Sequence, residues 1–478
     1  MKIRLGKIKN IHFVGIGGIG MSGIAEVLVN LGYKVSGSDK SLSDVTEYLE
    51  KRGVRISDKH VPENVKDADV LVYSSAVTTD NPEVQEAYRR KIPVIKRAEM
   101  LAELMRLKFG IAIAGTHGKT TTTSLTGAVL SEGELDPTLI IGGKVRALGT
   151  NAKLGDSEFL VAEADEYDKS FLRLIPTIAV ITNIEADHLE SYDSLDDLKN
   201  SFISFANKVP FYGRVIICLD NPGVQEILTR IERSITTYGF NKQADIQAYN
   251  VEHKNGGIAF DINYMKYKLG RIELKIPGEH NVLNTLAAIA VGLELDIPFE
   301  KIKSGLEKFS GVKRRFEHKA VINDVMVVDD YAHHPSEILA TLQAARRGWP
   351  QRRLLALFQP HLYSRTRDFY MDFARSFLQV DVLIGTDVYP AREKPMEGVS
   401  GKLITDTAAS LGHKEVHYVA DKTEIPEYVA DLVRAGDMVI TLGAGDIWKF
   451  GEALIEVMKS RIQNKRKKPV GGSGSREK

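Results

Sequence analysis

The sequence predicts an α/β protein of three domains with mostly parallel sheets. Short apolar strands alternate with helical patterns through almost the whole chain, as in IHFVGIG, DVLVYSSA and IAVITNIEADH, and this alternation is typical of parallel sheets. Glycine-rich turns follow several strands and open the next helix. The chain has 478 residues, more than a single core supports, and typical domain sizes indicate about three domains.

Changes in this pattern set the expected domain limits. A Rossmann-like first domain covers residues 1–107, where the helical stretch RAEMLAELMRLK gives way to a new strand. A second domain covers residues 108–317, and its glycine-punctuated alternation between about 240 and 278 predicts a small antiparallel edge sheet. A second Rossmann-like domain covers residues 318–460. The basic, Gly/Ser-rich residues 461–478 predict a disordered tail.

Charge and cysteine content exclude several classes of protein. The 64 Lys and Arg residues nearly balance the 63 Asp and Glu residues, so no global field attracts the chain to nucleic acid or to a membrane. Cys218 is the only cysteine, which excludes a disulfide framework and fits a reducing compartment. No apolar run reaches about 18 residues, and no signal-peptide pattern is present. We therefore predict a cytoplasmic protein without nucleic-acid or membrane partners.

The stretch IAIAGTHGKTTTT, over residues 111–123, is the most specific feature of the sequence. An apolar strand leads into a glycine turn that lets the backbone approach phosphate oxygens, Lys119 brings positive charge, and the Thr120 hydroxyl can reach Mg²⁺. Ile113 stands where the strict P-loop motif has glycine, so this is a shorter form of that motif. Residues 108–317 are therefore expected to form a P-loop-type ATPase domain. The residues expected around the phosphates of ATP are Gly115, Thr116, His117, Gly118, Lys119, Thr120 and Thr121.

A second glycine turn lies near the N-terminus. Gly15, Gly17 and Gly20 form a GxGxxG pattern after the strand IHFV, and Asp39 follows about 20 residues later, as in dinucleotide-binding domains. That pattern alone favours a nicotinamide-dependent dehydrogenase. Glycines that open a helix, however, accept any diphosphate, including that of a nucleotide sugar. Two phosphate loops in one chain therefore indicate a diphosphate-bearing substrate at the first and ATP at the second, although a turn used only for helix packing is the alternative.

Acidic residues follow the strand FLVAEADEYD. Four of them lie close together, namely Glu163, Asp165, Glu166 and Asp168. Carboxylates this close repel one another unless a cation such as Mg²⁺ neutralises them. Glu163 ends the strand that follows the phosphate loop, so we expect it to share Mg²⁺ with Thr120 and expect some of the other acids to belong to a solvated loop.

Other polar side chains of the expected central domain allow two interpretations each. His188 follows a strand end in ITNIEADHLE, where α/β sheets place ligands, and both a structural role and a metal or phosphate role fit it. His280, Asn281 and Asn284 open a helix in PGEHNVLNTLAA, and the two asparagines share a face. They fit either a helix cap or amides that face adenine.

Polar and basic residues also follow the strands of the expected third domain. Arg314 and Arg315 stand at its boundary. The segments DDYAHHP and FQPHLYSRTRDF contribute Asp330, Tyr331, His333, His334, His361, Ser364, Arg365 and Arg367. Because parallel strands gather ligands at their carboxyl ends, we predict a site for a small charged substrate such as an amino acid. GAGD, with Gly443, Gly445 and Asp446, is more typical of helix packing.

The succession of these segments resembles the Mur ligases over nearly the whole chain. The segments that carry the resemblance, in order, are GIGGIGMSGIA, GSD, SSAV, AGTHGKTTT, EADEYD, NIEADHL, GEHNVLN, GVKRRF, DDYAHHP, QPHLYSRTRDF and GAGDI. The resemblance implies three domains that bind a UDP-sugar, ATP and an amino acid, with Mg²⁺ as cofactor. It implies that ATP converts the lactyl carboxylate of UDP-N-acetylmuramate to an acyl phosphate, which the amine of L-alanine attacks. The enzyme is expected to be a monomer or a weak homodimer.

The resemblance also implies roles for individual residues. The expected catalytic residues are Lys119, Glu163, His188 and Arg315, and the expected metal ligands are Thr120, Glu163 and His188. The expected UDP-sugar contacts are Gly15, Gly17, Gly18, Gly20, Met21, Ser38, Asp39, Ser74 and Ser75. Adenine would meet His280, Asn281 and Asn284, and L-alanine would meet Tyr331, His333 and Arg365. Leu362 stands where some members carry arginine, so the carboxylate clamp depends more on Arg365.

Three alternatives remain open at this stage. A recycling ligase of the same family, which joins UDP-muramate to a preformed tripeptide, has a similar EADEYD segment, but GIGGIGM, NIEADHL and the QPH segment favour the alanine ligase. A dehydrogenase leaves GTHGKT unexplained. A nucleotide-dependent switch without chemistry leaves the acids and the strand-end polar residues unexplained.

Overall fold

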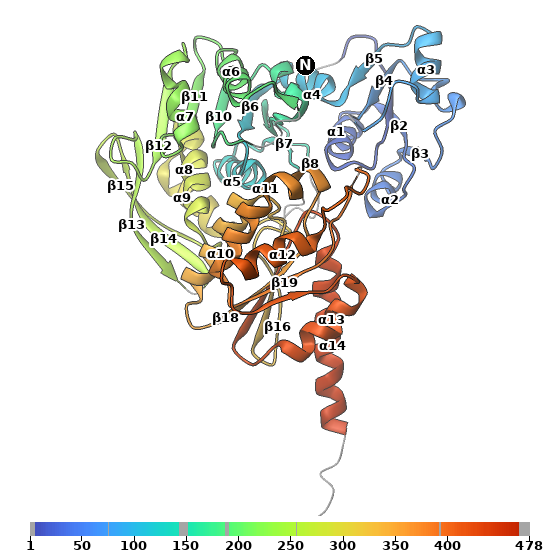
Figure 1. Cartoon of the computed structure of the whole chain (residues 1–478). Coiled ribbons are helices and arrows are strands. Elements are labelled where there is room, and N and C mark those ends of the chain that lie inside the picture. The colour runs from blue at the N-terminus through green and yellow to red at the C-terminus, as the bar shows by residue number, and fades with distance from the viewer. Residues whose placement is uncertain are drawn as a thin grey trace, which may run out of the picture. The chain divides into compact units, whose positions relative to one another are not determined.

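The computed structural model describes residues 5–74, 76–142, 152–186, 191–254, 256–391 and 393–467. The chain divides into two compact units. The first unit comprises Met1–Glu252, Ile258–Lys275 and His280–Val312, and the second comprises His253–Gly257, Ile276–Glu279 and Lys313–Lys478. Three sheets follow one another along the chain (Figure 1). The prediction of an α/β protein with mostly parallel strands is therefore confirmed.

The first sheet contains five parallel strands in the order β3-β2-β1-β4-β5. Its strands are β1 (Asn10–Val14), β2 (Lys34–Ser38), β3 (Arg55–Ser57), β4 (Val70–Tyr73) and β5 (Val94–Lys96), and its helices are α1 (Ile19–Asn30), α2 (Asp44–Lys51), η1 (Pro62–Val65), α3 (Pro82–Arg89) and α4 (Arg97–Arg106). The chain continues from β1 to one side and returns to β4 on the other, so the strand order reverses beside β1. A sheet of this kind binds ligands at that reversal, where the first glycine loop (residues 15–18) lies.

The central sheet contains ten strands in the order β15-β14-β13-β12-β11-β10-β6-β9-β7-β8. Its strands are β6 (Phe109–Ala114), β7 (Thr138–Ile140), β8 (Ala152–Lys153), β9 (Phe159–Glu163), β10 (Ile178–Ile181), β11 (Arg214–Cys218), β12 (Ile235–Gly239), β13 (Ile246–Lys254), β14 (Gly257–Tyr264) and β15 (Tyr267–Leu274). Its helices are α5 (Lys119–Glu132), η2 (Tyr167–Arg173), α6 (Leu195–Ala206), α7 (Pro222–Ile227), η4 (Leu228–Arg230), α8 (Glu279–Glu294) and α9 (Phe299–Lys308). The strand β6, which leads into the phosphate loop (residues 115–118), is central.

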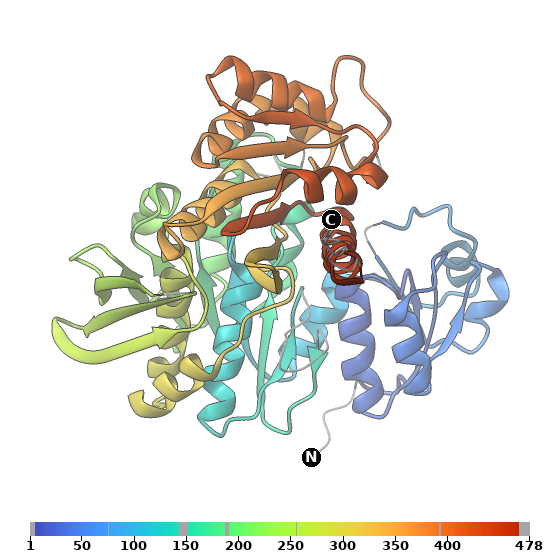
Figure 2. The same ribbon diagram turned by 90° about the horizontal axis from the view of Figure 1, so that it is seen from below.

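The predicted antiparallel strands are a continuation of this central sheet. β14 and β15 pair antiparallel, whereas β12 and β13 pair parallel, so one ladder leads into the other. Strands β13, β14 and β15 extend from the edge of the sheet as a curved ribbon (Figures 1 and 2). The expected alternation holds in β13, where more buried and more exposed residues alternate, whereas the first six residues of β14 are all buried, so β14 is covered on both faces there.

The second unit contains a six-stranded sheet in the order β16-β17-β21-β18-β19-β20, in which β16 alone is antiparallel to its neighbour. Its strands are β16 (Glu317–Ile322), β17 (Val325–Asp330), β18 (Arg353–Phe358), β19 (Val382–Gly385), β20 (Val416–Tyr418) and β21 (Asp437–Leu442). Its helices are α10 (Pro335–Gly348), α11 (Tyr363–Ser376), η5 (Phe377–Gln379), α12 (Gly401–Ser410), η6 (Lys422–Glu424), α13 (Ile425–Leu432) and α14 (Ile447–Lys467). Successive residues of β18 enter two different cores, one on each face of the sheet, as a parallel sheet covered on both sides requires.

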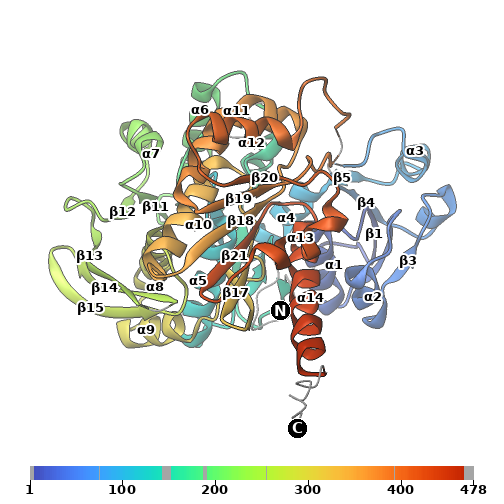
Figure 3. The same cartoon turned by 60° about the horizontal axis from the view of Figure 1, so that its bottom comes forward.

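The C-terminal helix corrects one expectation. Residues 461–467, which the sequence analysis places in a disordered tail, continue α14 (Figures 1 and 3). Their stretch RIQNKRK has no helix breaker before Pro469, and Arg461 pairs with Glu427 and Asp431 of α13. Residues 468–478 lie outside the described residues. Among the described helices, none has both the length and the apolar character that a membrane crossing requires.

Candidate active site

The phosphate loop joins β6 to α5 in a conformation that requires both of its glycines. Gly115 and Gly118 have φ angles of 132° and 84°, a region that favours glycine. A Cβ atom at Gly115 would lie 2.1 Å from the Thr182 hydroxyl, and one at Gly118 would lie 2.5 Å from Asn284 Oδ1. α5 begins directly after Gly118, so its first backbone N–H groups lie at the loop, where they can bind an anion; that this anion is a phosphate of ATP stays a prediction.

Lys119 is held at this loop by several oxygen atoms. Its Nζ donates to the carbonyls of Gly115 and Thr116 at 2.6 and 3.1 Å, and to both carboxylate oxygens of Glu166 at 2.9 Å. Burial alone would lower the pKa of Lys119, but the nearby negative charges, that of Glu166 above all, outweigh it and raise the pKa. Lys119 is therefore a charged, positioned ammonium group that can bind phosphate oxygens.

Glu166 is not one of the solvated acids that the sequence analysis expects in this segment. Its side chain is 1% exposed, and the hydroxyl of Tyr192 donates to its backbone carbonyl. The irregular turn η2 follows it, in which Asp168 and Lys169 adopt left-handed φ angles of 52° and 59°. The sequence contains one signal for the burial of Glu166. A buried lysine such as Lys119 needs a counter-ion nearby, and the acidic segment can supply it.

Glu163 lies at the carboxyl end of β9, where the sequence analysis expects it. Parallel pairing places Glu163 opposite Ile113 on β6, and its carboxylate accepts from the backbone N–H of Gly142 at 2.6 Å. Thr120 is half-buried in the first turn of α5. A hydroxyl and a carboxylate are oxygen ligands that fit Mg²⁺, and their joint binding of the ion stays a prediction. His188 lies outside the described residues.

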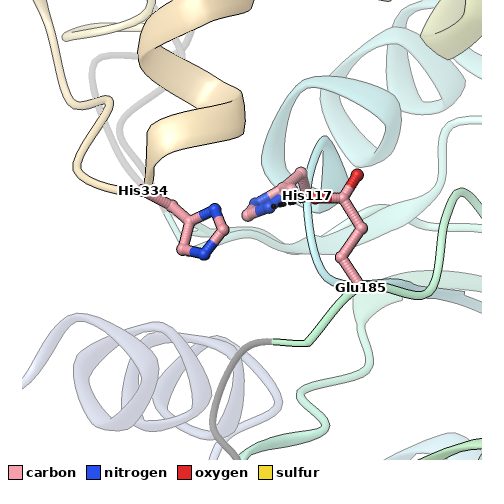
Figure 4. A group of neighbouring side chains, drawn as sticks. All are labelled: His117, Glu185 and His334. Atoms are coloured by element: carbon pink, nitrogen blue, oxygen red, sulfur yellow. Dashed lines mark ion pairs between the residues drawn. The ribbon is translucent and has the colours of Figure 1, made fainter. Parts of the chain in front are cut away.

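The chain that follows β10 supports the phosphate loop from the other side. Asn183 accepts from the backbone N–H of His117 at 2.8 Å and donates to its carbonyl at 3.0 Å, and Thr182 donates to the same carbonyl at 2.6 Å. The His117 ring lies 3.4 Å from the Glu185 carboxylate (Figure 4). His334, the third side chain of Figure 4, belongs to the second unit, where its Nδ1 lies 2.8 Å from the Ser336 hydroxyl.

One of the two asparagines of α8, Asn284, also contacts the first turn of α5. Asn284 accepts from the Thr122 hydroxyl at 3.1 Å and donates to Asn281 Oδ1 at 3.2 Å. Both amides are buried, and His280 is half-buried at the helix start. The structure thus places the Asn284 amide against the loop, with Asn281 bonded to Asn284, and their contact with adenine stays a prediction.

The first glycine loop gathers several of the predicted UDP-sugar residues. The backbone N–H of Gly17 donates to the Asp39 carboxylate at 2.8 Å, and a Cβ atom at Gly15, whose φ is 80°, would lie 3.0 Å from the Ser74 hydroxyl. These residues lie at the carboxyl ends of β1, β2 and β4, at the reversal of strand order. Gly18 is exposed directly before α1. Ser75 lies outside the described residues.

Two other residues of that prediction lie beneath the loop. Met21 and Ser38 are 1% and 0% exposed. Met21 is on the core side of α1, while the Ser38 hydroxyl donates to Glu83 at 2.5 Å and its carbonyl accepts from Gly15 at 2.8 Å. Both side chains therefore support the loop and are not on its surface.

Arg97 is a residue that the sequence analysis missed. Its guanidinium lies 3.6 Å from the Asp165 carboxylate, and a Cβ atom at Gly20 would lie 3.0 Å from it. It begins α4, and no motif marks it. A guanidinium in this place can bind a phosphate or a carboxylate.

The predicted amino-acid residues come together in the second unit. Arg314 and Arg315 lie over the Tyr331 ring, with guanidinium carbons 4.9 and 5.3 Å from its centre. The ring of His333 lies 5.2 Å from that of Tyr331 and 5.9 Å from that of His361. These aromatic and basic groups form one polar cluster at the carboxyl ends of β17 and β18.

Burial sets the charge of two groups in this cluster. It lowers the pKa of His361 to about 4, with help from the charges of His333 and Arg365, so the imidazole is neutral. Burial also raises the pKa of Asp330 to about 6, against the opposing effect of Arg315. Asp330 accepts backbone N–H groups of Phe316 and Ala332 at 2.7 and 2.8 Å, which makes it a structural acid.

The loop after β19 adds two residues to the cluster that the sequence analysis missed. Tyr389 stacks on His361 with ring centres 5.7 Å apart, and Glu393 accepts from the backbone N–H of Ser364 at 2.9 Å. Arg365 is 7% exposed in the first turn of α11. The GAGD turn receives the Arg314 guanidinium at the Gly443 carbonyl, at 2.6 Å, in accord with a packing role.

Nearly the whole chain is similar to known proteins. Residues 10–109 match the model of the Mur ligase family, catalytic domain, residues 113–292 that of the Mur ligase middle domain, and residues 314–445 that of the Mur ligase, glutamate ligase domain. The UDP-N-acetylmuramate–L-alanine ligase of Geobacter sulfurreducens is 55% identical over 459 residues, which cover 96% of this chain and 99% of that protein.

Solved structures agree with this result. The UDP-N-acetylmuramate-alanine ligase of Thermotoga maritima superposes with a TM-score of 0.81 at 30% identity, over 95% of this chain and 100% of that one. A murein peptide ligase of Psychrobacter arcticus has a TM-score of 0.69 at 24% identity, over 94% and 98% of the two chains, and this likeness shows the fold alone. The three matched regions and the 55% identical relative show that the chain belongs to the Mur ligase family of ATP-dependent, amide-forming ligases.

Proposed function

We propose that this protein joins L-alanine to the lactyl carboxylate of UDP-N-acetylmuramate in peptidoglycan precursor synthesis. ATP is consumed, ADP and phosphate are released, and an acyl phosphate is the intermediate. The observation that carries the proposal is the ammonium of Lys119, held in a glycine loop at the carboxyl edge of a central parallel strand. Identity of 55% over nearly the full length to UDP-N-acetylmuramate–L-alanine ligases supports the choice of substrates.

The first half of the reaction is a phosphoryl transfer. A carboxylate oxygen of the lactyl group attacks the γ-phosphorus of ATP, the bond to the bridging oxygen breaks, and ADP leaves. Lys119 and the backbone N–H groups that open α5 stabilise the negative charge on the transferred group. Thr120 and Glu163 would hold Mg²⁺, which supplies further neutralisation of phosphate charge when bound.

The second half of the reaction is an acyl transfer. The amine of L-alanine attacks the carbonyl carbon, a proton is lost from nitrogen, and phosphate leaves with one oxygen of the original carboxylate. Arg365 and Tyr331 would bind the amino acid, with His333 and the neutral His361 beside them. Gly15, Gly17 and Asp39 would bind the UDP-sugar. We place the reaction in the cytoplasm, since it consumes ATP and a nucleotide sugar. We propose that the enzyme is a monomer or a weak homodimer.

A coupled assay of ADP release tests this function. ADP is expected only when UDP-N-acetylmuramate and L-alanine are both present, and Lys119→Ala is expected to abolish it. Lys402→Ala is the matched control, because Lys402 is an exposed lysine paired with Asp406 on the surface of α12, and this variant is expected to keep full activity. ADP released with a tripeptide but not with alanine would assign the recycling ligase. Absence of labelled oxygen from the lactyl carboxylate in the released phosphate would refute the acyl-phosphate route.

A further inference from the structure

The ion pair between Lys119 and Glu166 is the closest charge contact of the phosphate loop among the described residues. Both carboxylate oxygens lie 2.9 Å from Nζ, and the two side chains are 16% and 1% exposed. Lys119 makes its other contacts with two loop carbonyls. A phosphate oxygen that binds this ammonium must therefore either share the ammonium with Glu166 or displace the Glu166 carboxylate from it.

The backbone around Glu166 is fixed. Its carbonyl accepts from the Tyr192 hydroxyl and, at 3.0 Å, from the backbone N–H of Lys169. The Lys169 ammonium in turn lies over the Tyr192 ring, 5.1 Å from its centre, and pairs with Asp197 at 2.8 Å. The backbone of Glu166 is therefore anchored beside the loop, and its carboxylate reaches Lys119 from this position.

We propose that Glu166 is a positioning residue that holds Lys119 at the phosphate loop and weakens the binding of ADP there. This proposal rests on the proposed function, because it takes ATP and ADP to be the nucleotides that bind at this loop. Glu166 compensates the buried ammonium, which otherwise carries an unpaired charge. The same carboxylate repels any phosphate bound to that ammonium, because two negative groups then lie within a few ångströms of each other.

The consequence for turnover is faster product release. ADP and ATP both contact the loop, so Glu166 lowers the affinity for each, while the ammonium stays in the place where the transferred phosphoryl group needs it. An enzyme of this kind gives up ground-state affinity for nucleotide and keeps its transition-state contact. A carboxylate with a purely structural role has no such effect on ADP affinity.

Glu166→Gln tests the proposal in the full-length chain. Calorimetric titration with Mg²⁺ and ADP is expected to show binding tighter by about tenfold or more, as removal of one nearby like charge predicts. KM for ATP and kcat are expected to fall together, since ADP leaves more slowly. Asp168→Asn is the matched control, because Asp168 is exposed in the same acidic segment and its left-handed φ of 52° suits asparagine. This control is expected to bind ADP like the wild type.

Stability without nucleotide provides a second measurement. Glu166→Gln is expected to lower the melting temperature, ADP is expected to restore it, and the double variant Lys119→Met with Glu166→Gln is expected to be more stable than Glu166→Gln alone, since no unpaired charge remains. If Glu166→Gln does not fold, Glu166→Asp moves the carboxylate away from Nζ and is expected to bind ADP about threefold tighter. ADP binding that is unchanged or weaker in these variants would overturn the proposal. Tighter ADP binding without any amide formation would leave it standing and reject the proposed function.

Discussion

Removal of Glu83 is expected to destabilise the first sheet and leave the second unit unaffected. The Glu83 side chain is 0% exposed and accepts from the Ser38 hydroxyl at 2.5 Å and from the Asn64 amide. Nδ1 of His60 lies 3.2 Å from the carboxylate and Nε2 of His12 lies 3.5 Å from it. The variant Glu83→Ala leaves one or two of these buried groups without an acceptor and opens a small cavity, at a cost of about 2–4 kcal/mol.

The positions of the tryptophans determine the assay. Trp349 and Trp448, the two tryptophans of the chain, both belong to the second unit, so their fluorescence reports the unfolding of that unit. Hydrogen exchange of the amides in β1, β2 and β4 reports the first sheet. A loss of 2–4 kcal/mol corresponds to exchange faster by roughly 30- to 1,000-fold where opening controls exchange. The tryptophan transition is expected to stay at the wild-type denaturant concentration.

The same variant also affects the first glycine loop. The carbonyl of Ser38 accepts from the backbone N–H groups of Gly15 and Ile16 at 2.8 and 3.1 Å, so loosening Ser38 is expected to raise KM for UDP-N-acetylmuramate with little change in KM for ATP. Glu86→Gln is the control, because Glu86 pairs with arginines on the surface of the same helix. Exchange in β1 and β2 at the wild-type rate would refute the reasoning, as would an equal shift of the tryptophan transition.

Three further predictions concern the loop, the second unit and the amino acid. Gly115→Ala is expected to abolish ADP binding in calorimetry, because its Cβ would lie 2.1 Å from the Thr182 hydroxyl, whereas Gly348→Ala, which meets nothing within 4 Å, is expected to bind normally. Asp330 has its pKa raised from 3.8 to about 6, so the folded chain binds the proton more tightly than the unfolded chain. The free energy of unfolding, measured by tryptophan fluorescence, should therefore fall by up to about 3 kcal/mol as the pH rises from about 4 to about 6. Asp330→Asn should flatten this dependence on pH. Arg365→Lys is expected to raise KM for L-alanine about tenfold and leave KM for ATP unchanged, since lysine lacks the planar fork that binds a carboxylate; equal changes in both constants would contradict a role in alanine binding.

The parts of the site that the sequence predicts are those whose physical cause is local. An apolar strand, two glycines with positive φ and the start of a helix occur within residues 109–120, so the phosphate loop is visible as a pattern of neighbouring residues. The position of Glu163 follows almost as directly. It is the last residue of a strand, and parallel pairing of β6 with β9 brings strand ends to the same edge.

The network around Glu83 could not be predicted in this way. His12, Ser38, His60 and Glu83 come from four separate segments, and each has an ordinary sequence context. They meet because β1 and β2 are adjacent in the sheet, His60 follows β3, which pairs with β2, and α3, which carries Glu83, follows β4, which pairs with β1. Ser38 illustrates the consequence, since the motif GSD suggests a ligand contact, whereas its hydroxyl is buried against Glu83.

Glu166 shows where motif reasoning stops and where a further step was available. Four acids in six residues suggest a solvated loop, yet the left-handed turn at Asp168 and Lys169 leaves Glu166 buried and the next two residues exposed. The turn itself has no clear signal in the letters EADEYD. The charge of Lys119 does give one, because a lysine in a tight glycine loop is desolvated and requires a carboxylate within hydrogen-bonding distance. A search for that partner among the acids at the neighbouring strand end would have selected this segment, and the burial of Glu166 then decides which acid it is.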